Sequence, residues 1–226
     1  MKRIHFILIG MALFIAACST TTHIIGAWEA PDYTPPKDDF KKIAVVALSH
    51  NESSKMLFEQ VFVERLQYLG YEAMYGSKIL IPSIVKKENK EMLEKMMKDN
   101  GVDGVLVLSL LQVKDGVRYV PGTGAYAPGA YYGGWYGYYS YNYYNYYSDP
   151  GYYESTTSLY LEANFYDLTK APSSDSAAYD GKLVSSIQTE TVDPMDIEDL
   201  ADSFSYTILT KLISQGILKN KSKDKK

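Results

Sequence analysis

The first half of the chain alternates continuous apolar runs with apolar residues at helical spacing. Residues 41–49 (KKIAVVALS) form an apolar run without alternation, which is typical of a strand covered on both faces. Residues 50–71 repeat apolar side chains at helical spacing and reach Gly70, which favours the end of a helix. A short strand, a helix and a third buried strand are predicted next, at 71–76, 86–101 and 102–113. This βαβαβ order predicts a parallel sheet.

The second half changes to the two-residue period of a half-exposed sheet. Residues 156–168 alternate apolar and polar side chains, and residues 181–192 fit the returning strand of an antiparallel hairpin. A final helix is expected to begin with Asp193 as its N-cap and Pro194 at its first position. We therefore predict one α/β domain at residues 41–218. It has a βαβαβ parallel core followed by a β-hairpin and a C-terminal helix, with helices flanking the sheet.

The N-terminus has the pattern of a secretory signal peptide. Lys2 and Arg3 precede an apolar run from Ile4 to Ala17. A helix over that run is about 21 Å long at ~1.5 Å per residue, which is short of the ~30 Å hydrocarbon core of a bilayer. We predict that residues 1–17 are removed rather than retained as a membrane span.

The sequence IAAC at the cleavage site resembles the bacterial lipobox, in which the cysteine receives lipid. Cys18 is the only cysteine of the chain, and acylation consumes a thiol that is otherwise a reactive leftover in an exported protein. Each buried CH₂ adds ~0.8 kcal/mol of membrane affinity, so several acyl chains hold a protein stably. Ser19 rather than an aspartate follows, which resembles the pattern for outer-membrane export. We predict a lipid-anchored outer-membrane protein facing the periplasm; an ordinary secreted protein is the alternative.

Two polar segments flank the predicted domain. Residues 18–40 contain Pro31, Pro35 and Pro36, which fix backbone angles and favour an extended tether after the lipidated cysteine. Residues 219–226 (KNKSKDKK) form a basic tail that we expect to be solvated.

Charge and residue content narrow the classes of function. The formal net charge of −4 becomes −6 when Lys2 and Arg3 leave with the signal peptide, which disfavours nucleic acid as a partner. His23 and His50 are then the remaining histidines, so zinc held by nitrogen and sulfur ligands is not expected. His50 follows the first strand, where open α/β sheets place ligands, although a capping or surface role is the commoner one. Because no nucleophile or phosphate motif is present, we predict neither an enzyme nor a cofactor.

A tract of tyrosine, glycine, serine and asparagine interrupts the domain at residues 119–155. It keeps neither the strand nor the helix period, so we expect an excursion whose replacement over residues 126–153 leaves the fold intact. Antibody paratopes share its composition, which favours a surface that contacts an envelope protein, peptidoglycan or another glycan. The predicted contact residues are Trp135, Tyr136, Tyr138, Tyr139, Tyr143 and Tyr144. Self-association through an uncharged, β-prone segment and, less favoured, a lid over an enzyme site are the alternatives.

The order of these segments resembles a family of small Gram-negative envelope lipoproteins. The resemblance rests on FKKIAVVALSHN, FEQVFVERLQYLGYEA, DGVLVLSLLQV, LEANFYDL, GKLVSSIQTET and, most specifically, a Tyr/Gly-rich tract directly after RYVPG. More distantly, the layout is similar to LpoB-like and CsgG-like periplasmic domains and to the N-terminal domain of TolB. The resemblance implies a binding or assembly role in the envelope and carries no catalytic residue to this chain.

Overall fold

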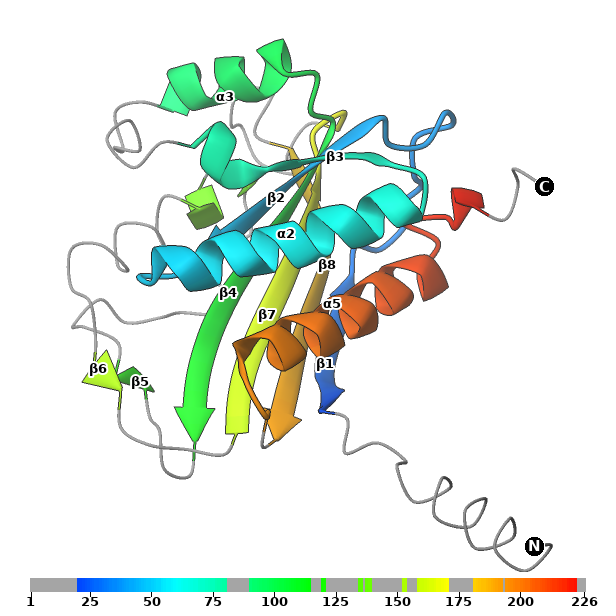
Figure 1. The fold of residues 1–226 in the computed structure, drawn as a ribbon. Coiled ribbons are helices and arrows are strands. Elements are labelled where there is room, and N and C mark those ends of the chain that lie inside the picture. The colour runs from blue at the N-terminus through cyan, green and yellow to red at the C-terminus, as the bar shows by residue number, and fades with distance from the viewer. Residues whose placement is uncertain are drawn as a thin grey trace, which may run out of the picture.

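A six-stranded mixed sheet forms the centre of the protein, in the strand order β1-β8-β7-β4-β2-β3 (Figure 1). The computed structural model describes residues 20–80, 90–114, 119–120, 134–135, 137–139, 152–153, 158–170, 181–192 and 194–222. The sheet strands are β1 (Thr21–Glu29), β2 (Lys42–Leu48), β3 (Glu72–Tyr75), β4 (Gly104–Lys114), β7 (Ser158–Asp167) and β8 (Lys182–Val192). The helices are α2 (Glu52–Tyr68), η1 (Gly76–Lys78, a 3-10 turn), α3 (Lys90–Asp99) and α5 (Ile197–Ser214).

The strand pairing confirms the predicted fold class. Strand β2 runs parallel to both β3 and β4, which gives the βαβαβ core. Strands β7 and β8 form the antiparallel hairpin, which pairs with β4 through β7. Gly70 and Gly216 end α2 and α5 with positive φ angles of 95° and 71°, a conformation that favours glycine. Among the described residues, no helix is both long and apolar enough to cross a membrane.

Each face of the sheet has its own hydrophobic core. Helices α2 and α5 cover one face and meet through the rings of Phe58, Phe62 and Phe204. Helix α3 covers part of the opposite face, where Leu93 and Met97 pack on the sheet. The interior strands β2 and β4 are therefore buried on both sides, which explains their continuous apolar sequence.

The segment predicted as a tether forms a strand instead. Residues 21–29 are β1, which pairs antiparallel with β8 and extends the sheet. The alternation in this segment is weak because β1 lies at the edge of the sheet and most of its side chains are exposed. The prolines at 31, 35 and 36 belong to the connection between β1 and β2 rather than to a long flexible arm.

The start of the basic tail packs on the domain rather than extending into solvent. The Lys221 ammonium lies 3.3 Å from the Asp39 carboxylate and donates to the Phe40 carbonyl at 3.1 Å. The Lys221 amide donates to the Leu69 carbonyl at 3.0 Å. The aromatic ring of Tyr71 lies under the same ammonium. An ion pair and a cation–π contact thus hold Lys221 on the domain, although the lysine-rich sequence of the tail predicted that it is solvated.

The tyrosine tract contributes to the second core, which its sequence did not predict. Trp135 and residues 137–139 are helical, and the side chains of Trp135, Tyr138 and Tyr139 are buried on the sheet face that α3 only partly covers. The tract also contains β5 (Tyr119–Val120) and β6 (Tyr152–Tyr153), which pair with each other. Trp135, Tyr138 and Tyr139 therefore form part of the core, whereas the aperiodic sequence suggested an excursion outside it.

We predict that the tract is required for stability. Trp135→Ala removes a fully buried indole and should lower the free energy of unfolding by about 3–5 kcal/mol. The control Tyr206→Ala, on the exposed side of α5, should change it by no more than about 0.5 kcal/mol. Urea denaturation of both variants measures the difference. Equal stability of the two variants would mean that the tract does not form part of the core.

Candidate functional site

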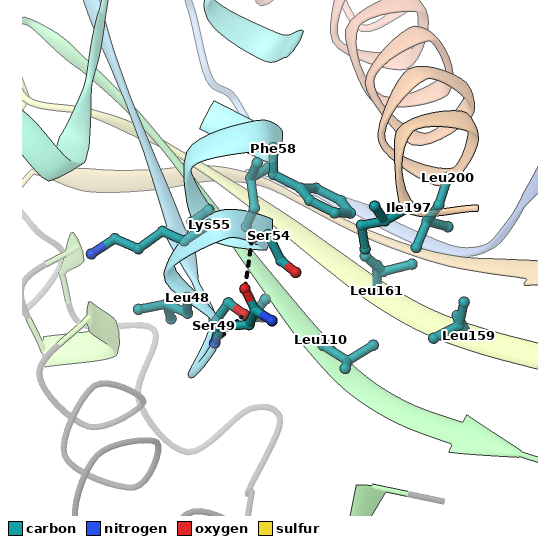
Figure 2. A pocket seen from close by; sticks show the side chains of 14 residues that line it. Leu48, Ser49, Ser54, Lys55, Phe58, Leu110, Leu159, Leu161, Ile197 and Leu200 are labelled. Atoms are coloured by element: carbon teal, nitrogen blue, oxygen red, sulfur yellow. Dashed lines mark hydrogen bonds between the residues drawn. The ribbon is translucent and has the colours of Figure 1, made fainter. Parts of the chain in front are cut away.

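An apolar pocket opens between the first turns of α2 and α5. It has a cavity volume of about 290 Å³, close to the lower end of the range for small-molecule sites, ~300–1,000 Å³. Figure 2 shows Leu110, Leu159 and Leu161 from β4 and β7 facing Ile197 and Leu200 from α5. The pocket lies next to the carboxyl end of β2, a place where open α/β sheets often hold ligands, although for His50 at this position the sequence favoured a capping or surface role.

The walls of the pocket form because α2 and α5 both begin beside it. Asn51 is the N-cap of α2, and its side-chain oxygen accepts from the Ser54 amide at 3.1 Å (Figure 2). The Ser49 hydroxyl accepts from the Asn51 amide. Asp196 caps α5 by accepting from the Asp199 amide at 2.8 Å, three residues after the predicted cap at 193. The side-chain cap of α5 therefore lies later than the sequence pattern suggested.

The polar groups of the pocket are few. Ser49, Asn51 and Ser54 line it together with Lys55. Ser109 also lines it, but its hydroxyl bonds to Tyr138 on the opposite face of the sheet. The Lys55 side chain is buried, and its ammonium lies 3.7 Å from the Glu52 carboxylate. Figure 2 shows it pointing away from Leu110, Leu159 and Leu161. The cavity therefore offers an apolar body with hydroxyl and amide groups at one side, an arrangement suited to an apolar ligand group.

His50 lies beside the pocket but is not one of its lining residues. Partial burial lowers the pKa of its imidazole, because a desolvated cation is disfavoured. Across the described residues, no group of three or more histidine, cysteine, aspartate or glutamate side chains is placed to hold a metal ion.

The buried carboxylate of Glu59 hydrogen-bonds to β2, the strand whose carboxyl end lies beside the pocket. Strand β3 pairs with β2 only as far as Val45, so the Ala47 amide lies beyond its reach. Glu59 of α2 accepts from that amide at 3.3 Å and from the amide and hydroxyl of Ser77 at 3.0 and 2.6 Å. Burial raises the pKa of Glu59, against the opposing effect of these hydrogen bonds and of Lys55.

The three described contact residues of the tract, Trp135, Tyr138 and Tyr139, do not line this pocket. Trp135, Tyr138 and Tyr139 lie in the core on the opposite face of the sheet, so their side chains are not the exposed contact surface that the composition suggested. The remaining candidates, Tyr136, Tyr143 and Tyr144, and the lipidation residue Cys18 lie outside the described residues.

The hydroxyl of Tyr138 instead belongs to a buried polar cluster around Glu162. It donates to the Glu162 carboxylate at 2.5 Å and lies 2.8 Å from the Ser109 hydroxyl. Asn164 and Gln188 donate to the same carboxylate, each at 3.0 Å. Several donors thus stabilise a carboxylate that is fully buried. The cluster connects the tract to β4, β7 and β8.

Sequence reasoning missed both the pocket and the Glu162 cluster. Leu159 and Leu161 were assigned correctly to the apolar face of their strand, but periodicity does not show whether two helices fill the space above that face. Glu162 alternates with these leucines, so the predicted half-exposed hairpin places it on the solvated face. That expectation is wrong, because Glu162 is fully buried and bonds to Tyr138, 24 residues away in the chain.

The sequence matches no model of a known protein family and no characterised protein. Among solved structures, the PelC dodecamer from Paraburkholderia phytofirmans has 11% identity and a TM-score of 0.42, covering 85% of this chain and 97% of that chain. Lipoprotein GNA1162 from Neisseria meningitidis has 14% identity and a TM-score of 0.36, covering 77% and 99%. TolB from Acinetobacter baumannii has 15% identity and a TM-score of 0.33, covering 86% and 31%. All three similarities are distant, so the function of this chain has to be inferred from its own residues.

The raised pKa of Glu59 gives a prediction for pH dependence. At pH values between the ordinary carboxyl pKa of 4.5 and the higher pKa in the fold, the folded state keeps a proton that the unfolded state has lost. The contribution of Glu59 to stability is therefore full below pH 4.5 and falls as pH rises through that window, by ~1.4 kcal/mol for each unit of pH. Glu59→Gln does not titrate, so its stability relative to wild type should improve with rising pH. Urea denaturation from pH 4 to 8 measures this difference, and a constant difference would contradict it.

Proposed function

We propose that the protein is a non-catalytic binding module of the bacterial envelope, whose binding site is the apolar pocket between the starts of α2 and α5. In this proposal lipid on Cys18 anchors it to the outer membrane and the domain faces the periplasm. The single observation that carries the proposal is the open cavity of about 290 Å³ lined by leucine, isoleucine and phenylalanine side chains. Pockets of this kind, apolar with a few polar groups at one side, are the usual form of ligand sites.

The chemistry of the lining favours an apolar group as ligand. A glycan needs hydrogen-bonding side chains over much of its surface, because its hydroxyl groups lose water on binding. The pocket supplies such groups mainly from Ser49, Asn51 and Ser54 at the start of α2. A leucine or aromatic side chain from an envelope protein matches the cavity better, with the polar rim pairing to the backbone of that protein. Tyr136, Tyr143 and Tyr144 remain predicted contact residues for the same partner.

Filling the pocket should abolish ligand binding. Ser54 lines the cavity, whereas its neighbour Ser53 is exposed and does not. Ser54→Phe places a ring in the cavity, so we expect at least a tenfold loss of affinity for the apolar fluorophore 1-N-phenylnaphthylamine, which corresponds to ~1.4 kcal/mol. Fluorescence titration of the purified protein measures the affinity.

Ser53→Phe is the matched control, because it adds the same ring one position away and should bind the fluorophore as wild type does. Equal binding by both variants would show that the pocket is not the binding site. Retention of the native circular dichroism spectrum in both variants separates loss of binding from loss of the fold.

Self-association is a second candidate function, favoured by the edge strand β1. In the part of the chain that the structure describes, β1 has a strand neighbour on one side only, and Ile24, Ile25 and Trp28 are exposed along it. Such an edge is a template for pairing with another strand. In this second candidate function, β1 pairs with β1 of another copy of the protein, which gives an isologous contact.

A charge on this edge should oppose self-association. Ile25→Lys is expected to weaken it at least tenfold, or ~1.4 kcal/mol, because lysine on an edge strand disfavours pairing with a second strand. Sedimentation velocity of the unacylated Cys18→Ala protein, with and without this change, measures the effect. The control Tyr206→Lys places the same charge on the exposed side of α5. A monomeric parent protein at all concentrations would reject this second function.

A further inference from the structure

The end of β8 and the start of α5 expose a group of apolar side chains. Met195 is 66% exposed, and Val192 and Ile197 are each 44% exposed. We call these three residues the α5-start patch. Large apolar groups that gather on one surface generally mark a site that meets a partner or a membrane.

The first described residues of the chain are tied to this patch. The Thr20 hydroxyl bonds to the Asp199 carboxylate and accepts from the Met195 amide at 3.4 Å. Thr21 is the register partner of Val192. Strand β1 therefore begins at the end of the sheet where β8 ends and α5 starts (Figure 1). The N-terminal segment enters the fold beside the patch.

The chain length between Cys18 and the patch is short. One residue, Ser19, lies between Cys18 and Thr20, and the two Cα–Cα steps span at most about 7 Å at ~3.6 Å each. Each headgroup layer of a bilayer is also about 5–7 Å thick, from the difference between the ~30 Å core and the ~40–45 Å total. An acylated Cys18 thus has no flexible spacer that would hold the patch away from the headgroups.

We infer that the α5-start patch lies against the lipid bilayer, with Met195 in the interfacial layer. This inference rests on the lipid anchor at Cys18 in the proposed function. Asp196, Glu198 and Asp199 begin α5 beside the patch, and their charge suits zwitterionic headgroups better than anionic ones. Ile197 belongs to both the patch and the pocket lining, so this orientation places one rim of the pocket beside the membrane.

Site-directed spin labelling of the acylated protein tests the inference. Lipid occupies the Cys18 sulfur, so a cysteine introduced by Met195→Cys is the one free thiol of that chain. The acylated protein is bound to vesicles of phosphatidylcholine and phosphatidylethanolamine. Collision of the nitroxide with a water-soluble nickel chelate should fall several-fold relative to the same label on unacylated Cys18→Ala protein in buffer, while collision with oxygen should rise.

Tyr206→Cys is the matched control, because Tyr206 is on α5 and is similarly exposed, at 63% against 66% for Met195. It lies about 14 Å along the helix from the first residue of α5, Ile197, at ~1.5 Å per residue. Its label should remain accessible to nickel on vesicles. Suppose that the protein floats with the vesicles but the labels at 195 and 206 are equally accessible to nickel. This result would overturn the inference and leave the anchor intact. Failure of the acylated protein to float would overturn the anchor and the inference together.

Discussion

Strands β2 and β4 are apolar on both faces, and the need to cover both faces determines how the rest of the chain is used. On one face, Ile43, Val45 and Leu106 are covered by α2 and α5. On the other face, Ala44 and Val105 need a second layer, and the described part of α3 has 10 residues and about 15 Å of length at ~1.5 Å per residue. The tract supplies the missing cover through Trp135, Tyr138 and Tyr139. Tyrosine content that suggests a binding surface by composition thus serves burial in these described residues.

The sheet face that α3 and the tract cover is apolar at β4 and polar at β8. Glu162 lies at the boundary between the two parts. Val105 and Val107 of β4 face the tract, whereas Gln188 and Ser186 of β8 are polar. A carboxylate buried at this boundary is costly unless donors surround it, and β7, β8 and the tract each provide at least one. Tyrosine suits this position better than phenylalanine because its ring covers apolar strand residues while its hydroxyl reaches the carboxylate. The cluster therefore fixes where the tract lies on the sheet.

Local sequence signals predicted the elements well, and contacts between distant segments were the part they missed. The apolar run at 41–49 and the helical repeat ending at Gly70 are found as predicted, because burial on two faces and a glycine cap each leave a direct sequence pattern. Strand β1 was missed because an exposed edge strand needs no alternation of apolar and polar residues. The packing of Lys221 on Asp39 and Tyr71 was missed because composition reports the charge of a residue and not its partner.

The position of β1 relates the start of the described chain to the pocket. Because β1 belongs to the sheet, the end at which it begins is also the end at which β8 stops and α5 starts. The pocket is lined by the middle of β4, the first residues of β7 and the first turn of α5, and the last two of these lie toward that same end. Tyr138, which the Glu162 cluster holds, lies on the opposite face and does not line the pocket. If lipid is attached to Cys18 as proposed, a rigid edge strand in place of a tether would fix the direction in which the pocket opens relative to it. Binding at the pocket would then depend on how far a partner reaches toward the membrane.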